Sequence, residues 1–188
     1  MKKYPLWKAL MDYGVSLIAL LVLGPILIIL IILASVDTGG FGVFTQKRIG
    51  RNGVPFVIYK FRTYDIKNTQ KTKMGKWLRK TKMDELLQLI NIIKGDMSLV
   101  GPRPDLPGYY DKLEGEDRLI LQLKPGITSE AGIKYRNEEE LLNRQENPLK
   151  YNDEVIFPDK VKMNLEYYYN LSFKRDILIM WKTFSVFV

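Results

Sequence analysis

Cysteine and histidine are both missing from this chain of 188 residues. Their absence excludes disulfide bonds, thiolate metal ligands and any nucleophile that depends on a histidine base. A zinc site is disfavoured as well, because proteins hold zinc mostly through cysteine and histidine. Any catalysis must therefore use carboxylates, lysine, arginine or tyrosine, or a hard metal ion bound by oxygen.

Acidic residues are also few relative to basic ones. Asp and Glu number 21 against 29 Lys and Arg, which gives a net charge of +8. This balance favours anionic partners, namely nucleic acid, phosphorylated small molecules or anionic lipid headgroups. The length and the 46% hydrophobic content suit a single compact domain.

Charge is absent from residues 13–36, an apolar segment long enough for a membrane helix. A signal peptide is disfavoured, since the segment is too long and lacks a convincing cleavage pattern. Gly24 and Pro25 fall near its middle, where proline removes a backbone hydrogen bond and kinks the helix. Basic residues flank both ends, as expected when both ends face the cytoplasm. They are Lys2, Lys3 and Lys8 before the segment, and Lys47, Arg48, Arg51 and Lys60 after it.

Two interpretations of this segment remain open, a re-entrant helix-break-helix and a kinked span. Each arm would rise about 17 Å at about 1.5 Å per residue, while half of the hydrocarbon core measures about 15 Å. We favour the re-entrant form, which enters one leaflet and returns after a break at Gly24 and Pro25.

The remainder predicts an α+β fold that is mostly helical with short strands. Two strands are expected around a turn at Arg51-Asn52-Gly53, and the basic stretch 74–80, interrupted by Trp77, suits a membrane interface. A helix is expected to begin at Asp84-Glu85 and end at Lys94-Gly95, and helix is expected again over 160–187. We predict a membrane-embedded part at 1–36 and one integrated cytoplasmic catalytic domain at 37–188.

The adjacent acids Asp84 and Glu85 can be interpreted in two ways. Thr81-x-x-Asp84 resembles a capping box, and acids are favoured in the first turn of a helix. Neighbouring residues on a helix point in different directions, so the pair could instead serve a reacting centre and a metal.

Basic residues near this pair suggest a polyanionic substrate. Lys60 and Arg62 are two apart on a strand and share a face, and Arg79 precedes the acids. Arg103 lies between two prolines, so its backbone is stiff and little freedom is lost when its forked guanidinium binds a phosphate. Singly, each is an ordinary solvated cation; together they suggest phosphates bridged by magnesium.

The ordered blocks FTQKRIGRNGVPFVIYKFRT, DELLQLINIIKGDMSLVGPRP and KPGIT resemble those of the bacterial sugar transferase family, the small monotopic phosphoglycosyl transferases. The resemblance implies a re-entrant membrane helix, interfacial helices and transfer of a phosphosugar from a UDP-sugar to undecaprenyl phosphate, with release of UMP. It further implies Asp84 as nucleophile through a covalent intermediate, Glu85 as a Mg²⁺ ligand, and Lys60, Arg62, Arg79 and Arg103 as phosphate contacts. The implied location is the cytoplasmic face of the bacterial inner membrane, at the first membrane step of glycoconjugate assembly, with downstream glycosyltransferases as possible partners and no nucleic acid.

The chain departs from the family pattern after KPGIT. Many members continue with a Gly-Trp-Ala-Gln run and a Gly-Arg-Asn, whereas this chain has Ser129-Glu130-Ala131-Gly132 and then Tyr135-Arg136-Asn137. Arg136 is the matching candidate for a phosphate contact, and the donor sugar stays open. Without the extra N-terminal helices of larger members, the chain is expected to be the minimal catalytic unit.

Two rival functions also remain. The first is a glycosyltransferase that cleaves the sugar–phosphate bond and releases UDP. The second is a non-catalytic, membrane-anchored basic module that binds nucleic acid or anionic lipid, with cations spread along a stripe.

Overall fold

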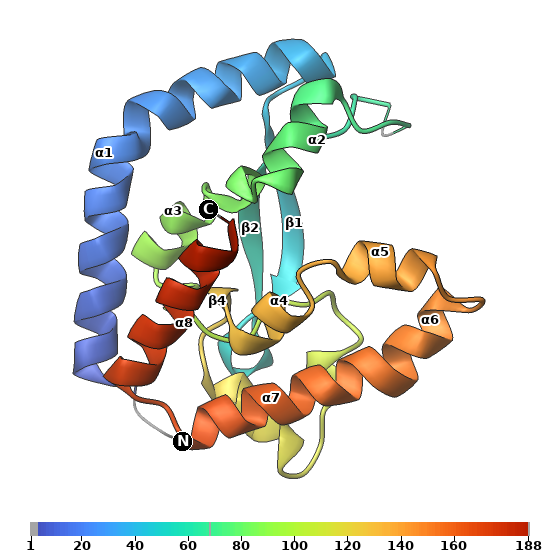
Figure 1. Ribbon diagram of the computed structural model, residues 1–188. Coiled ribbons are helices and arrows are strands. Elements are labelled where there is room, and N and C mark those ends of the chain that lie inside the picture. The colour runs from blue at the N-terminus through green and yellow to red at the C-terminus, as the bar shows by residue number, and fades with distance from the viewer. Residues whose placement is uncertain (1–3, 68, 188) are drawn as a thin grey trace. The chain divides into compact units, whose positions relative to one another are not determined.

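The computed structural model describes residues 4–67 and 69–187, which are mostly helical with a few short strands (Figure 1). The predicted α+β class is thus confirmed. The chain divides into two compact units, and each is described by itself. Within the described residues, the α1 unit comprises residues 4–48 and 55–99, and the α7 unit comprises residues 49–54 and 100–187.

The α1 unit contains a long helix, a strand pair and short helices. In chain order these are α1 (Leu6–Thr38), β1 (Val43–Ile49), β2 (Pro55–Phe61), α2 (Lys73–Lys80), the 3₁₀ turn η2 (Met83–Glu85), α3 (Gln88–Ile93) and β3 (Ser98–Val100). β1 and β2 pair as neighbours in one sheet, which confirms the two strands expected around the turn at Arg51-Asn52-Gly53.

Helix α1 is continuous through Gly24 and Pro25, and Figure 1 shows it bent along its length. Its outward face carries exposed leucine, isoleucine and valine side chains. Within the part of the chain that the structure describes, it is the one helix long and apolar enough to cross a membrane. The structure therefore agrees with a membrane anchor, while the re-entrant course within a bilayer and the division at residue 36 stay predictions.

The second half of α1 is held by apolar packing. Leu27, Leu30 and Ala34 are buried in one cluster with side chains of β2, α2 and the segment after η2. Those partners are Phe61, Leu78 and Leu87. The packing leaves the opposite face of this half exposed, as in a helix with one side against protein and the other against lipid.

The first half of α1 is held by a polar contact. The buried Asp12 carboxylate accepts hydrogen bonds from the Ser98 hydroxyl, at 3.1 Å, and from the Leu99 backbone N–H, at 3.0 Å. Tyr4 also donates its hydroxyl to Asp12. A buried carboxylate is costly unless its oxygens accept hydrogen bonds. These donors therefore fix the first half of α1 to strand β3, which precedes Gly101-Pro102-Arg103-Pro104.

Helix α3 is tied to strand β2 by one buried amide, that of Asn91. The Asn91 side chain accepts from the Tyr59 backbone N–H at 3.1 Å and donates to the Val57 carbonyl at 2.7 Å. The Asn91 amide thus bonds to backbone groups of β2 that a neighbouring strand would otherwise pair with. The contact sets α3, and with it η2, against the strand that carries Lys60.

The α7 unit is built from short helices and turns around α7. Its elements are η1 (Arg51–Gly53), η3 (Tyr110–Lys112), η4 (Asp117–Gln122), β4 (Gly126–Thr128), α4 (Glu130–Lys134), α5 (Glu138–Asn143), α6 (Pro148–Tyr151), the π-helical turn η5 (Asn152–Ile156), α7 (Phe157–Tyr169) and α8 (Phe173–Phe187). Its core gathers Ile49, Tyr110, Ile120, Leu121 and Val161. At the predicted turn, Asn52 and Gly53 have positive φ, which such turns require. The helix expected over 160–187 is interrupted, because α7 ends at Tyr169 and α8 begins at Phe173.

Candidate active site

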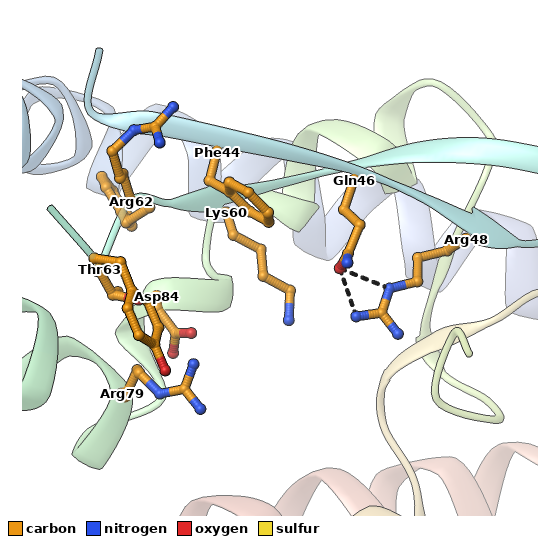
Figure 2. Close-up of a pocket in the computed structure, with 10 residues that line it drawn as sticks. Phe44, Gln46, Arg48, Lys60, Arg62, Thr63, Arg79 and Asp84 are labelled. Carbon is orange, nitrogen blue, oxygen red and sulfur yellow. Dashed lines mark hydrogen bonds between the residues drawn. The ribbon is translucent and has the colours of Figure 1, made fainter. Parts of the chain in front are cut away.

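A pocket with a volume of about 140 Å³ lies in the α1 unit, against the β1–β2 pair (Figure 2). It is lined by Phe44, Gln46, Arg48, Lys60, Phe61, Arg62, Thr63, Tyr64, Arg79 and Asp84. The ≈ 140 Å³ is less than the roughly 300–1,000 Å³ of a pocket that encloses a drug-sized ligand. Its size and its cations suit phosphate groups, with the remainder of a larger substrate lying beyond it.

Strand β2 supplies Lys60 to this pocket, and Arg62, the residue after the strand, lines it as well. Phe61 between them is buried in the core that includes α1. The Lys60 ammonium points into the pocket and lies 2.9 Å from Oε1 of Glu85. The Arg62 guanidinium points away from Asp84 in Figure 2, and its Nε donates to the Phe41 carbonyl at 2.8 Å.

Helix α2 supplies Arg79 from the opposite side. The Thr72 hydroxyl accepts from the Gly75 N–H at 3.0 Å and so caps the start of α2. A Cβ at Gly75 would lie 2.1 Å from the Thr63 carbonyl oxygen, so only glycine allows this close approach of α2 to the end of β2. The Arg79 guanidinium then lies 6.0 Å from the centre of the Tyr64 ring, at the pocket wall.

Asp84 and Glu85 lie in the 3₁₀ turn η2, both buried. The expectation that they begin an α-helix is wrong, since α3 starts only at Gln88. The capping box is wrong too. Thr81 ends α2, its hydroxyl donates back to the carbonyl of Trp77 at 3.0 Å, and Lys82 then takes a positive φ of 57°. Lys82 thus separates α2 from η2, and Glu85 of η2 reaches Lys60 of β2.

The surroundings of Asp84 have two opposing effects on the pKa of its carboxyl group. Burial raises the pKa of its carboxyl group above the ordinary value, and the neighbouring Glu85 charge adds to that rise. Lys60, Arg79 and Lys82 oppose it, because their positive charges favour the ionised form. Asp84 is thus a desolvated carboxylate kept within reach of several cations.

Asp84 and Glu85 fit a magnesium ion only if a substrate supplies further ligands. Within residues 4–67 and 69–187 there is no group of three or more acidic side chains that could hold a metal. Glu85 and Asp84 are adjacent, and Glu85 already has a cationic partner in Lys60. Two carboxylates suit Mg²⁺ when substrate phosphates supply further oxygens, and they do not form an all-protein cage.

Arg103 and Arg136 belong to the α7 unit, and both are exposed. Arg103 follows β3, in the loop whose Gly101 N–H donates to the Thr128 carbonyl at 3.0 Å. Arg136 follows α4, whose start is capped by the Ser129 hydroxyl, an acceptor from the Gly132 N–H at 2.9 Å. Within the α1 unit the structure brings together Lys60, Arg79, Asp84 and Glu85, while the roles of Arg103 and Arg136 stay predictions.

The sequence analysis missed the contribution of strand β1 to the pocket. Phe44, Gln46 and Arg48 alternate along β1 and all line the cavity. The period of a strand indicates that residues i, i+2 and i+4 share a face, but it does not indicate that this face borders a pocket. These residues were assigned only to a strand or to the basic flank of the apolar segment.

Comparison with known proteins places this sequence in a class. The sequence pattern described as bacterial sugar transferase matches residues 3–188. A putative undecaprenyl-phosphate N-acetylgalactosaminyl 1-phosphate transferase of Bacillus subtilis is 34% identical over 69% of this chain and 75% of its own length. A UDP-glucose:undecaprenyl-phosphate glucose-1-phosphate transferase of Klebsiella pneumoniae is 35% identical over 77% of this chain and 35% of its own length.

The chain therefore belongs to the bacterial sugar transferase family, which confirms the resemblance. The names of the relatives also confirm the enzyme class, a phosphoglycosyl transferase. The chain spans less than half the length of several relatives, including 41% of the galactosyl transferase CpsE of Streptococcus agalactiae.

Proposed function

We propose that this protein transfers a phosphosugar from a UDP-sugar to undecaprenyl phosphate, giving an undecaprenyl-diphosphate-sugar and UMP. The observation that carries the proposal is the buried carboxylate of Asp84 at the wall of a pocket also lined by Lys60 and Arg79. A carboxylate needs no histidine to become a nucleophile, since it ionises without a base.

In the first half of the reaction, a carboxylate oxygen of Asp84 attacks the sugar-bearing phosphorus of the donor. The bond between that phosphorus and the bridging oxygen breaks, the oxygen leaves with UMP, and the phosphosugar remains on Asp84. Lys60 and Arg79 line the pocket beside Asp84, where their charge offsets that of the phosphoryl oxygens.

In the second half, a phosphate oxygen of the lipid acceptor attacks the same phosphorus. The bond to Asp84 breaks, its carboxylate is regenerated, and the diphosphate-linked product leaves. The split into two steps lets a soluble donor and a lipid acceptor use one small pocket in turn. The small cavity suits this order, because its volume of about 140 Å³ fits phosphate groups rather than a whole substrate.

Glu85 and the donor phosphates are the groups that would hold magnesium. The metal, when bound, supplies positive charge to the non-bridging phosphoryl oxygens. Glu85 would be available to hold it if Lys60, now 2.9 Å from its Oε1, paired with a phosphate instead.

The proposal includes a monotopic position on the cytoplasmic face of the inner membrane, with α1 re-entrant. Asp12 in the first half of α1 and Leu30 in the second half both contact the α1 unit through buried groups. A helix of 33 residues would rise about 50 Å if straight, more than the roughly 30 Å hydrocarbon core. A straight span would separate the two halves across the bilayer, and a bent helix allows both to meet one unit. Amphipathic α2 and α8, with Trp77 and Trp181 exposed, suit the interface.

The two rival functions differ in what they release. A glycosyltransferase would release UDP, and a basic binding module would release neither nucleotide. The clustering of Lys60 and Arg79 around a buried carboxylate, instead of along a stripe, favours the enzyme.

The test is incubation of the purified protein with undecaprenyl phosphate and a panel of UDP-sugars. We expect UMP with at least one donor, and this donor identifies the sugar used at the first membrane step before downstream glycosyltransferases act. Release of UDP, or of no nucleotide across the panel, would contradict the proposal.

A further inference from the structure

The Gln46–Arg48 pair on β1 lines the active-site pocket and has no role in the chemistry above. The Gln46 side-chain oxygen accepts from Arg48 Nε at 3.1 Å and from Arg48 Nη2 at 2.6 Å. These two nitrogens form one edge of the guanidinium, so the amide fixes the plane of the group. The Gln46 amide is neutral, so this contact orients Arg48 without neutralising its positive charge.

Arg48 also lies at a defined place in the pocket. Figure 2 shows it across the pocket from Asp84, with the Lys60 ammonium pointing into the space between them. A phosphoryl group on Asp84 would therefore have Lys60 beside it and Arg48 on the side away from the nucleophile. An oriented guanidinium is suited to bidentate contact with a phosphate.

Phosphoryl transfer places the attacking and leaving oxygens roughly in line, on opposite sides of the phosphorus. When Asp84 attacks, the UMP phosphate leaves from the side opposite Asp84. When Asp84 is itself the leaving group, the acceptor phosphate must enter from that same side. The departing and the entering phosphate thus occupy one position at different times.

We propose that Arg48, oriented by Gln46, binds the phosphate at this position, first that of departing UMP and then that of the lipid acceptor. This inference rests on the proposed function and adds a binding residue and a positioning residue to it. One cation then serves both half-reactions, which explains how a small pocket handles two unlike substrates through the group they share.

The test measures two constants in the same protein, the inhibition constant of UMP and the KM for undecaprenyl phosphate. In Arg48→Ala we expect both to rise together by about 10- to 100-fold, the usual effect of losing a hydrogen bond to a charged group. The control is Lys47→Ala, which removes the same charge from an exposed neighbour that does not line the pocket. Both constants should stay within about twofold in the control.

A second variant separates phosphate binding from a structural role of the pair. Gln46→Glu keeps an oxygen acceptor for Arg48, but the glutamate charge neutralises that of the Arg48 guanidinium. We therefore expect the UMP inhibition constant and the KM for undecaprenyl phosphate to rise in this variant as well. If the pair only stabilised β1, glutamate would preserve it, and wild-type constants in Gln46→Glu would overturn the inference. A rise in one constant alone, or an equal rise in Lys47→Ala, would also overturn it.

The outcome is distinguishable from failure of the proposed function. UMP release by the wild-type protein with unchanged constants in Arg48→Ala would overturn the inference alone. Absence of UMP release from the wild-type protein would overturn both.

Discussion

Asp84 and Glu85 are neighbours with different surroundings. Glu85 is paired with Lys60 at 2.9 Å, whereas burial and the Glu85 charge hold the pKa of Asp84 above its ordinary range. A carboxylate with a raised pKa is a stronger nucleophile once ionised, because basicity and nucleophilicity rise together. The environment thus favours Asp84 for attack and Glu85 for binding a cation, which agrees with the proposed division of roles.

This environment predicts a pH-dependent effect of Asp84→Asn on stability. Because the pKa of Asp84 is raised in the folded state, its contribution to stability is full below the unfolded value near 3.8 and is lost as the pH rises through the folded value. At neutral pH the buried charge therefore destabilises the fold. Asparagine cannot ionise, so the variant should have the higher melting temperature at pH 8, and this advantage should shrink at pH 4.

The measurement is thermal unfolding of both proteins in the same detergent across that pH range. The Asp159→Asn variant is a control, since hydrogen bonds from Lys134 and Tyr135 lower the pKa of Asp159. Its change in melting temperature should have the opposite sign. Equal melting temperatures for Asp84→Asn and wild type at pH 8 would contradict the desolvation of Asp84.

Glu85→Gln tests the metal role at the level of a single charge. The variant keeps the shape of the side chain but removes its negative charge, so we expect lower turnover and lower magnesium affinity together. Titration of activity with Mg²⁺ should give a half-saturating concentration at least about tenfold higher, as expected for loss of about 1.4 kcal/mol. Full activity of the wild-type protein in excess chelator would refute a metal at Glu85.

At the scale of elements, the strands and helix ends that local sequence signals mark were predictable. The turn at Arg51-Asn52-Gly53 predicted the paired strands β1 and β2. Lys94 and Gly95 marked the end of α3, where Gly95 takes a φ of 87°. These features depend on neighbours in sequence, so the sequence alone carries them.

The features that depend on tertiary contacts were not predictable. Thr81 resembled a helix start, yet its hydroxyl serves the end of α2, and η2 is held against β2 through Asn91 of α3 and the Lys60–Glu85 pair. The part played by Gln46 and Arg48 emerges only when β1 lies beside η2 and α2 at the pocket. Nothing local in the sequence distinguishes a pocket-lining arginine from a solvated one.

Gly75 allows a prediction about the placement of α2. An alanine Cβ there would lie 2.1 Å from the Thr63 carbonyl oxygen, so α2 must move away from the end of β2. We expect Gly75→Ala to destabilise the fold by about 1–3 kcal/mol, as overpacking does, and to lower turnover because Arg79 moves with the helix. Thermal unfolding and UMP release measure the two effects.

Gly14→Ala is the matched control for that variant. A Cβ at Gly14 would meet nothing within 4 Å. Alanine in a helix interior is favoured over glycine by roughly 0.5–1 kcal/mol, so the control should be neutral or slightly stabilised. Wild-type stability of Gly75→Ala would contradict the close contact of α2 with β2.

At the scale of the whole molecule, the course of α1 decides the membrane topology. A chain without cysteine allows single cysteines to report position by labelling. We expect cysteines introduced at Lys3 and at Lys67, before and after α1, both to be protected from an impermeant thiol reagent in intact cells and both to react after lysis. Labelling of only the Lys3 position from outside would establish a span and exclude the re-entrant helix.

The central claim for the whole molecule is that the reaction passes through a covalent phosphosugar on Asp84. The most direct measurement is mass spectrometry of the protein after incubation with the UDP-sugar that supports turnover, without acceptor. We predict a mass increase equal to one phosphosugar on the peptide that contains Asp84, which disappears when undecaprenyl phosphate is added. The Asp84→Asn variant, folded and inserted, should show neither the adduct nor UMP release. UMP release by that variant at a near wild-type rate, or an adduct on a different residue, would contradict the account.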